Sequence, residues 1–455
     1  MKKYKELIKN LGFFLIPLYT AVLTTEEYGS YDFIFTTISL LVPLLTLNIS
    51  EAALRFLIEK KNSKSQIINI TIKYNLLSIF IIFIFVILNY LFNFIELFNT
   101  YVIYFILMYV CNLIYVMMQN IIRGMDRLND IAVSGIINSI FTLGLNLIFL
   151  LYFKIGLTGY FLSTIFANFI ASLFLFFKID YKSINLKDKI DPKVDKEMRD
   201  YGKPLALNSI AWWINSVSDR YFVTFICGLA VNGVYSISYK IPSILSMFQS
   251  IFNQAWVISA AKEYDKNDSN NFFSNTYKSY NYIMVICCSL LIIFAKIIAK
   301  FLYLKDFYSA WIYTPFLLLS CVFGANSGFF GGVFSAVKNS KIIGVTTLIG
   351  ALLNIVFNFI LVIIIGPLGA AISTAFSYFV VWIIRLIYVK KYINFKISLY
   401  KDIFVYLLLL IQSILILTIN SNIVIFMEII IFAIINVVYY KNIKFVLKKL
   451  GGKNG

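Results

Sequence analysis

The sequence predicts an all-α polytopic membrane protein with about 14 transmembrane helices, and three observations support this fold class. The chain of 455 residues is 60% hydrophobic, whereas soluble domains contain about 45–50% apolar residues. Apolar runs of about 20 residues, enough to cross about 30 Å of hydrocarbon, recur along the chain. Of the 40 Lys and Arg residues, 33 lie in every second gap between these runs. Helices are expected because each segment in lipid must bond its own backbone polar groups.

Each apolar run is expected to form one membrane-spanning helix. The runs are 7–23, 31–50, 70–95, 101–122, 131–153, 159–177, 204–226, 233–257, 279–301, 310–335, 343–365, 368–388, 401–419 and 423–440. The basic N-terminus lacks the small-residue cleavage site of a signal peptide. The first run, although short, is therefore predicted to be the first span.

The distribution of basic residues predicts the orientation, because Lys and Arg are enriched in cytoplasmic loops. With both termini in the cytoplasm, 33 basic residues, Arg385 among them, face inward and four face outward. The remaining three, Lys73, Arg220 and Lys240, lie within runs. The predicted location is a bacterial cytoplasmic (inner) membrane, with multiple passes. The net charge of +18 is attributed to loops that face anionic lipid rather than to nucleic-acid binding.

The longest polar segment, 178–203, divides the runs into groups of six, six and two. The expected organisation has four parts. These are an N-terminal six-helix bundle (1–180), a cytoplasmic linker (181–203), a C-terminal six-helix bundle (204–390), and an additional helix pair with a basic cytoplasmic tail (391–455).

The two groups of six runs contain matching motifs, which indicates an internal duplication. Gly156-Leu-Thr-Gly159 matches Gly366-Pro-Leu-Gly369 at an offset of 210 residues. Tyr28-Gly-Ser-Tyr31 matches Asn232-Gly-Val-Tyr235 at an offset of 204. Because six is even, both halves start on the same side of the membrane, as parallel repeats around a central cleft. Such a cleft is the usual site of alternating access.

Residue content excludes several kinds of chemistry. The chain has no His, and its five Cys lie in apolar runs without metal-ligand spacing, so no metal site is expected. No Walker A motif occurs, which argues against a P-loop ATPase. The predicted external loops are too short to house a hydrolase site. We expect no catalytic residue and no cofactor, and we predict a secondary transporter rather than an enzyme.

Charged residues within membrane-spanning runs cost about 2.5–3.5 kcal/mol each and usually face a cavity or a partner. Asp219 and Arg220 lie near the external end of one run, and Lys240 lies near the external start of the next. Both cations are expected about 10 Å below the outer surface, where they could bind one anion. The alternative is that Asp219 pairs with a neighbouring cation and Lys240 extends its ammonium group to the surface.

Three further charged residues are candidates for a gate or for ion coupling. Glu51 and Arg55 are spaced i,i+4 on one helical face, so a local salt bridge is the alternative to a role at an inner gate. Asp32 lies just below the predicted external surface and is a candidate gate or proton site, with a surface position as the alternative.

Asn146 and Asn354 occupy matching places in the repeat. They are candidate substrate contacts, with interhelical hydrogen bonds as the alternative. Trp residues such as Trp256 could stack on a sugar or serve packing. Glu428, in the last helix pair, is expected to be peripheral.

Three segments contain family-specific motifs: FFLIPLYTAVLTTEEYGSYDF (13–33), LTLNISEAALRFLIEK (45–60), and 212–264 with its SDRY, NGVYS and KIPS elements. They resemble Wzx-type oligosaccharide flippases of the multidrug/oligosaccharidyl-lipid/polysaccharide exporter superfamily, and the similarity extends over essentially the whole chain. The resemblance implies two six-helix bundles in a V-shaped, pseudo-twofold arrangement with a cationic central cavity. The matching positions are Asp32, Glu51, Arg55, Asp219, Arg220 and Lys240. The chain departs from the family before Phe13, where a longer first helix is usual.

The predicted function is a flippase that moves undecaprenyl-diphosphate-linked oligosaccharide from the inner to the outer leaflet for surface polysaccharide biosynthesis. Its expected partners are that substrate, membrane lipids, a polysaccharide polymerase and glycosyltransferases, but no nucleic acid. Membrane potential would favour export of an anion by about 2.3 kcal/mol per charge per 100 mV; ion antiport at Asp32 or Glu51 is the alternative drive. The alternative functions are a multidrug or cation antiporter, which needs an acidic cavity, and a membrane acyltransferase or polymerase, which the absence of His disfavours.

Overall fold

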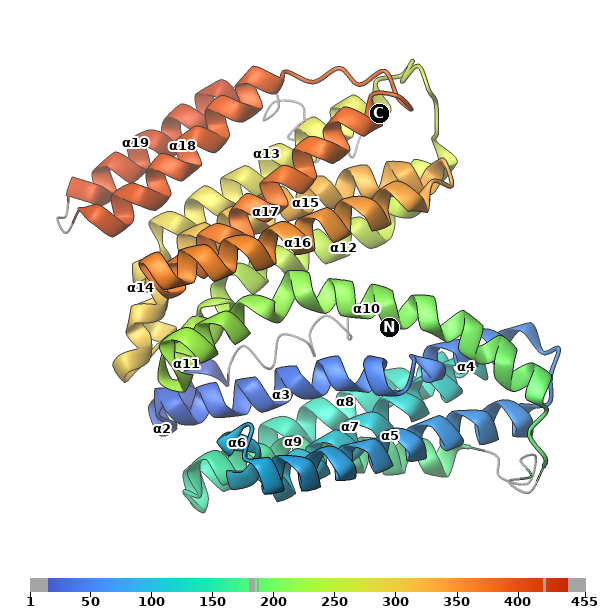
Figure 1. The fold of residues 1–455 in the computed structure, drawn as a ribbon. Helices are drawn as coiled ribbons and strands as arrows, with labels where there is room; N and C mark the ends of the chain where they lie inside the picture. The colour runs from blue at the N-terminus through green and yellow to red at the C-terminus, as the bar shows by residue number, and fades with distance from the viewer. Residues whose placement is uncertain (1–14, 180–184, 186–187, 420–422, 441–455) are drawn as a thin grey trace. The chain divides into compact units, whose positions relative to one another are not determined.

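The computed structural model describes residues 15–179, 185, 188–419 and 423–440, and within these ranges it contains helices and no strand (Figure 1). Ten of the described helices are long and apolar enough to cross a membrane. Large apolar side chains are exposed on them: on one helix, Phe80 is 61% and Leu91 67% exposed. Apolar surface of this extent is typical of contact with lipid. The predicted class, an all-α polytopic membrane protein, is confirmed.

The chain divides into two compact units, unit 1 (residues 1–213) and unit 2 (residues 214–455). Unit 1 contains α2 (Ile16–Val22), α3 (Thr25–Leu45), α4 (Ile49–Glu59), α5 (Lys64–Phe92), α6 (Glu96–Thr100), α7 (Val102–Gly124), α8 (Leu128–Asn146), the π-helical segment η1 (Leu147–Tyr152) and α9 (Gly156–Lys178). Helix α10 (Pro192–Cys227) contributes to both units. Unit 2 contains α11 (Leu229–Ser238), α12 (Lys240–Lys262), α13 (Phe272–Ile293), α14 (Ala295–Leu302), the 3-10 segment η3 (Lys305–Ile312), α15 (Thr314–Ala336), α16 (Ser340–Ile365), α17 (Pro367–Val389), α18 (Leu399–Thr418) and α19 (Ile423–Val438).

The beginning of the chain differs from the expected runs. The run 7–23 starts outside the described residues, and α2 represents its described part. Helix α3 begins at Thr25 rather than at residue 31 because a capping box precedes it. The Thr24 hydroxyl accepts from the Glu27 backbone N–H at 3.2 Å, and the Glu27 carboxylate accepts from the Thr24 backbone N–H at 2.8 Å. The Thr-Thr-Glu-Glu sequence contains this signal, and it satisfies two otherwise unpaired donors.

The segment 181–203, expected to be a linker, is partly helical. Helix α10 begins at Pro192, and proline is favoured in the first turn of a helix because it lacks an N–H that would go unpaired there. Val194 and Met198 are buried in the core of unit 1. Asp195 pairs with Lys73 of α5 at 3.3 Å. The second half of the expected linker therefore belongs to unit 1, because one face of this polar sequence is apolar at i,i+4.

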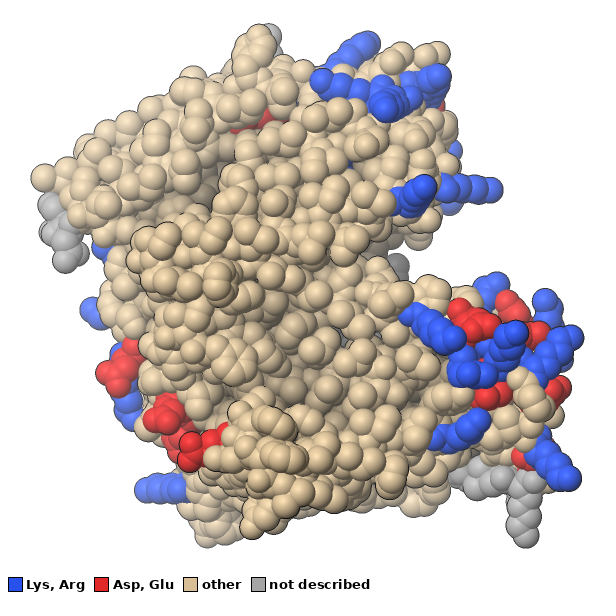
Figure 2. All heavy atoms as spheres, viewed as in Figure 1, with Lys and Arg blue, Asp and Glu red and all other residues tan. Residues whose placement is uncertain are grey.

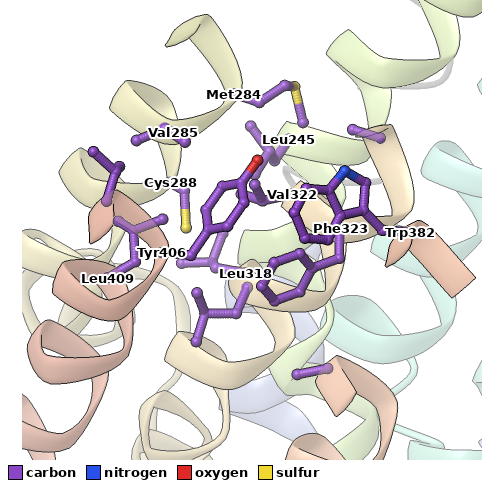
Figure 3. Close-up of a cluster of buried hydrophobic side chains, with 14 of the residues drawn as sticks. Leu245, Met284, Val285, Cys288, Leu318, Val322, Phe323, Trp382, Tyr406 and Leu409 are labelled. Atoms are coloured by element: carbon purple, nitrogen blue, oxygen red, sulfur yellow. The ribbon is translucent and has the colours of Figure 1, made fainter. Parts of the chain in front are cut away.

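Helix α15 forms the centre of unit 2 and is buried over most of its length. Figure 3 shows Leu318, Val322 and Phe323 of this helix facing Trp382 of α17 and Tyr406 of α18. All five side chains belong to one continuous buried cluster. The core of unit 2 is thus built around a single helix that contacts several neighbours.

Trp256 of α12 is part of the same core. It is 2% exposed, and its indole N–H donates to the Phe329 carbonyl oxygen at 2.8 Å. A Cβ on Gly332 would lie 2.5 Å from the indole ring, so only glycine permits this approach. Of the two roles considered for Trp256, the structure supports packing.

The two units share local structure at the offsets found in the sequence. Helices α3 and α11 begin at Thr25 and Leu229, which are 204 residues apart. The Ser163 hydroxyl donates to the Gly159 carbonyl at 2.7 Å, and Ser373, 210 residues later, donates to Gly369 at 2.8 Å. A shared helix start and a shared hydrogen bond are what a duplicated ancestor would leave.

Charged residues are distributed unevenly over each unit. Figure 2 shows a broad surface without charged residues on the visible face of each unit. In unit 1, acidic and basic residues gather where α4 ends and α10 begins, and Lys60 and Lys61 are exposed there. An apolar surface bounded by a charged end is the pattern expected of helices that cross a bilayer.

Candidate functional site

The candidate site lies where the helical path of unit 2 is interrupted. The expected run 233–257 is two helices, α11 and α12, with a break at Tyr239. Pro242 has no N–H to donate to the carbonyl of Ser238, four residues earlier, so a continuous helix would lose a hydrogen bond here. Lys240 is the first residue of α12. The break therefore places a basic residue at the start of a new helix inside the apolar part of the chain.

Asp219 of α10 forms the centre of a buried hydrogen-bond network at this break. It is 2% exposed. Its Oδ2 accepts from the hydroxyl of Tyr235 at 2.7 Å and from that of Tyr239, while its Oδ1 accepts from the Arg220 backbone N–H at 2.9 Å. These bonds satisfy a buried carboxylate with several donors, as its desolvation requires. The position of Asp219 fits a residue that holds α10 to α11 better than one that contacts substrate directly.

Arg220 is half-buried and contacts two members of this network, Asp219 through its backbone and Tyr239 through its side chain. Its guanidinium carbon lies 4.9 Å from the centroid of the Tyr239 ring, an arrangement that stabilises a cation over an aromatic face. Lys240 is also half-buried and follows Tyr239 directly. Arg220 thus lies against the Tyr239 ring, Lys240 follows that residue in the chain, and both cations belong to unit 2.

Asn354 of α16 extends the network through Ser218. The Ser218 hydroxyl donates to Asn354 Oδ1 at 3.2 Å, and Asn358 Nδ2 donates to the same oxygen at 2.8 Å. Asn354 Nδ2 donates to the Thr374 hydroxyl of α17 at 3.3 Å. The interhelical hydrogen bonds considered for Asn354 are present, and they connect α10, α16 and α17 beside Asp219.

Asn146 and Asp32 lie apart from this network, in unit 1. Asn146 is fully buried at the junction of α8 with η1, and its amide donates to the Thr142 carbonyl of its own helix at 2.7 Å. Asp32 is 8% exposed, so it does not occupy the surface position that was its alternative. It follows Tyr31, whose ring stacks on that of Tyr160 at 3.6 Å.

The expected side-chain pair of Glu51 and Arg55 does not form. Arg55 Nε pairs instead with Glu59 at 2.8 Å, also at i,i+4. Glu51 is exposed and accepts from Asn48 Nδ2 at 2.7 Å. Glu51 is the third residue of α4 and reaches back to the residue that precedes the helix, where a carboxylate is also favoured by the helix dipole. The i,i+4 spacing allowed Arg55 to pair with Glu51 or with Glu59. Arg55 pairs with Glu59 because Glu51, in the first turn of α4, bonds Asn48 instead.

Arg385 of α17 is a buried cation that the sequence prediction assigned to the cytoplasmic boundary. It is 7% exposed. Its Nε donates to the Thr346 hydroxyl at 2.9 Å, and its terminal nitrogens donate to the Ser327 carbonyl at 3.0 Å and the Thr347 hydroxyl at 3.0 Å. The surrounding sequence, Trp-Ile-Ile-Arg-Leu-Ile, is apolar on both sides and indicates burial more directly than the nearby Lys residues indicate an interface.

Unit 2 also contains an apolar pocket of about 340 Å³ between α15, α17 and α18. Phe323, Phe379 and Leu407 are among its lining residues, none of which is charged. An anion placed there would lose its hydration without gaining a partner. Among the described residues, no group of three or more His, Cys, Asp or Glu side chains is arranged to hold a metal ion.

These features define a class: a polytopic α-helical membrane protein with half-buried cations and buried polar side chains near a helix break. The sequence matches the family described as polysaccharide biosynthesis protein over residues 6–258, more than half of the chain, and the chain belongs to that family. An uncharacterized membrane protein of Methanocaldococcus jannaschii is 22% identical over 282 residues, which are 60% of this chain and 56% of the relative. The chain thus matches a little over half of that relative's length.

Two solved structures are similar in fold. The lipid II flippase MurJ, in an inward closed conformation, has a TM-score of 0.71 and 16% identity, with 99% of each chain covered. An inward-facing multidrug resistance MATE family transporter of the MOP superfamily has a TM-score of 0.66 and 15% identity, with 84% of this chain and 93% of the other covered. The chain therefore shares the fold of these two proteins.

Proposed function

We propose that this protein is a flippase that moves an undecaprenyl-diphosphate-linked oligosaccharide from the inner to the outer leaflet by alternating access. The observation that supports the proposal most is the pair of half-buried cations, Arg220 of α10 beside Tyr239 and Lys240 at the start of α12, in a member of the polysaccharide biosynthesis family. Broken membrane helices commonly bind anionic groups at the start of the second half-helix. Arg220 and Lys240 would bind the diphosphate, and Asn354 would contact the sugar or hold the helices around it.

The proposed transport needs no covalent chemistry. The lipid tail would stay in the bilayer while the polar head crosses. A substrate with about two negative charges leaving an interior-negative cell would gain roughly 4–5 kcal/mol per 100 mV if it crossed the full field. Asp32, Glu51 and Arg55 remain candidates for a gate or for ion coupling in unit 1, and Asn146 remains a candidate substrate contact there.

The test of the anion site is transport by Arg220→Ala and Lys240→Ala variants. Proteoliposomes containing the purified protein would be loaded with a lipid-diphosphate oligosaccharide, and its appearance in the outer leaflet would be followed by a membrane-impermeant lectin. We expect each variant to lose most of the activity. Arg123→Ala, which removes an exposed arginine from the last turn of α7, should retain it. Full activity in both site variants would refute the anion site.

A multidrug or cation antiporter is the second candidate function, favoured by the similarity to the multidrug resistance MATE family transporter. Expression of the protein in a drug-sensitive strain distinguishes the two functions. Raised resistance without flipping would support the antiporter. Genes for glycosyltransferases and a polymerase beside this one would support the flippase and its proposed partners.

The proposed location is a cytoplasmic membrane with both termini inside. A reporter enzyme fused after Lys187, in the long basic segment, should show the activity typical of the cytoplasm. Activity typical of the external side would reverse the orientation.

A further inference from the structure

Glu428 faces the interior of unit 2, contrary to its expected peripheral position. The buried residues of α19 are Val424, Glu428, Ile431 and Ile435, which recur at i, i+4, i+7 and i+11. This spacing is one face of a helix. Glu428 is 1% exposed and is the one acidic residue in an otherwise aliphatic stripe. The sequence does not reveal which face of α19 is buried, because the residues around Glu428 are apolar on every side of the helix.

Neither carboxylate oxygen of Glu428 has a hydrogen-bond partner among the described residues. Gln412 of α18 is the polar side chain that interacts with this carboxyl, in a geometry that falls short of a regular hydrogen bond. Gln412 Nε2 donates to the backbone carbonyl of Glu428 at 3.3 Å, and its Oε1 accepts from the Ser289 hydroxyl of α13 at 2.8 Å. Gln412 and Ser289 are both fully buried. Polar side chains of α13 and α18 are therefore linked to the backbone of α19 at Glu428, while the Glu428 carboxyl itself has no regular hydrogen bond.

Several charged and titratable groups lie on the elements around Glu428. They are Tyr277, Lys278, Tyr280, Tyr282, Cys287 and Cys288 on α13, Lys296 and Lys300 on α14, and Tyr400, Lys401, Asp402 and Tyr406 on α18. Lys278 and Asp402 lie ten or eleven residues from Ser289 and Gln412 along their helices, a distance of about 15 Å. Lys296 is the cation that acts electrostatically on Glu428.

The charge of Lys296 is stabilised by an aromatic ring as well as by any interaction with Glu428. Its Nζ lies 4.4 Å from the centroid of the Trp311 ring, in η3. A cation over an indole face is stabilised without a counter-charge. Lys296 is half-buried, whereas Lys300, one turn later on the same helix, is exposed. Lys296 can therefore remain charged while the Glu428 carboxyl is neutral.

We propose that Glu428 is a proton-binding site between α13, α18 and α19, and that Lys296 is the cation that compensates its charge when the proton leaves. A buried carboxylate without a regular hydrogen bond is strongly disfavoured, so this site favours the protonated carboxyl. Release of that proton would leave a negative charge that attracts Lys296 from the Trp311 ring. Glu428 itself lies on α19, outside the twelve helices of the two expected bundles, and the assignment does not depend on which substrate is transported.

The test is infrared spectroscopy of the purified full chain, without substrate, as pH is raised from about 4 to about 9. We expect a carboxylic-acid C=O band that is absent in Glu428→Gln, a variant of nearly the same shape. Treatment with dicyclohexylcarbodiimide, which modifies protonated carboxyls in apolar surroundings, should give an adduct on the α19 peptide that disappears at the same pH. A wild-type spectrum identical to that of Glu428→Gln at every pH would overturn the proposal.

Lys296→Gln and Lys300→Gln form a matched pair for the second half of the proposal. Lys296→Gln should move the midpoint of the Glu428 band upward by about one pH unit or more, because the ionised carboxylate loses its compensating charge. Lys300→Gln should leave the midpoint unchanged. Equal midpoints in the wild type and Lys296→Gln would refute the role of Lys296. Protection of Glu428 from modification by Na⁺ at constant pH would identify a metal cation rather than a proton as the occupant.

Discussion

The regions around Tyr31 in unit 1 and Tyr235 in unit 2 occupy equivalent places, 204 residues apart, but differ in chemistry. Tyr31 stacks on Tyr160 and shares a hydrogen bond of 2.8 Å with the Thr164 hydroxyl, which is a neutral partner. Tyr235 donates to the carboxylate of Asp219. The same fold element therefore holds an aromatic cluster in one unit and a charged network in the other.

The helices that contain these tyrosines also differ. Helix α3 continues from Thr25 to Leu45 before the path breaks ahead of α4, whereas the equivalent path in unit 2 breaks earlier, at Tyr239. At the offset of 204, Asp219 and Arg220 correspond to Leu15 and Ile16, both buried and apolar. Unit 1 thus forms with apolar residues at these two positions and with its break later along the path. Features that only one of two repeats keeps, at a cost in desolvation, are the ones to expect at a functional site.

The largest effect is expected from Asp219→Ala. Removal of the carboxylate leaves the Tyr235 and Tyr239 hydroxyls without their acceptor and removes the negative charge beside Arg220. We expect the free energy of unfolding to fall by about 3–5 kcal/mol, measured by denaturation of the purified protein in detergent. The free energy of unfolding should fall by less in Asp219→Asn, because the amide oxygen can still accept hydrogen bonds from the two hydroxyls. Equal stability of wild type and Asp219→Ala would show that this network does not hold unit 2 together.

The equivalent glycines Gly159 and Gly369 should respond unequally to alanine. A Cβ on Gly369 would collide with the backbone carbonyl of Leu361, whereas a Cβ on Gly159 would meet the Phe149 side chain at 2.8 Å. The atom met at Gly159 is the Phe149 Cβ, which moves only with its backbone, so both changes require a helix to shift, but the overlap at Gly369 is deeper. We expect Gly369→Ala to cost about 3 kcal/mol and Gly159→Ala about 1 kcal/mol, seen as a larger loss of melting temperature in Gly369→Ala. The reverse order would mean that the two helix pairs are not packed alike.

Removing one hydroxyl from each tyrosine tests the difference in chemistry directly. Tyr235→Phe loses a hydrogen bond to a charged acceptor, for which we expect a cost of about 1.5–3 kcal/mol. Tyr31→Phe loses one to a neutral hydroxyl, for which about 1 kcal/mol is expected. Both are measured as the change in unfolding free energy under one set of conditions. Equal costs would remove the energetic distinction between the two regions.

The smallest effect concerns the turn between α12 and α13. The Asp265 carboxylate accepts from the backbone N–H groups of Ser269 at 2.8 Å and Asn267 at 3.0 Å, and these bonds lower its pKa. A lowered pKa means that the bonds stabilise the turn above the ordinary carboxyl pKa of about 4 and are lost as pH falls through the lower, folded value. We therefore expect faster amide exchange at Asn267 and Ser269, corrected for intrinsic rates, only in acid.

Asp265→Asn is the control for this pH dependence and should abolish it. The equivalent position in unit 1 is Lys61, which cannot form such a turn with a carboxylate. The turn before α5 should therefore show no matching acid transition. An acid transition of equal size at Lys61 would mean that some other group titrates.

The helices were predictable to a large extent, because apolar runs of membrane length have few alternatives. Errors in the helix limits arose where a local signal was not counted: the capping box at Thr24 and Glu27, and Pro242 at the start of α12. The helical first part of α10 was missed because its composition is polar, although Val194 and Met198 are spaced for one buried face.

The candidate site was only partly predictable. Arg220 and Lys240 stood out because charges within apolar runs are costly, and both are found next to Tyr239. The pairing of Glu51 with Arg55 was wrong, because spacing allowed Arg55 two acidic partners and only the start of α4 at Ile49 distinguishes them. The positions of Arg385 and Glu428 were also misjudged, since proximity to loop residues or to the end of the chain does not reveal burial.

By itself the sequence determined that this chain forms membrane-spanning helices, and it predicts their orientation, because hydrophobic length and the placement of Lys and Arg are properties of local segments. Only the tertiary structure decided which polar groups meet. The partners of Asp219, Arg385 and Glu428 come from other helices, as when Ser289 and Gln412, 123 residues apart, lie together beside Glu428. Spacing along one helix restricts contacts to a turn or two, whereas burial and charge compensation depend on which helices pack side by side.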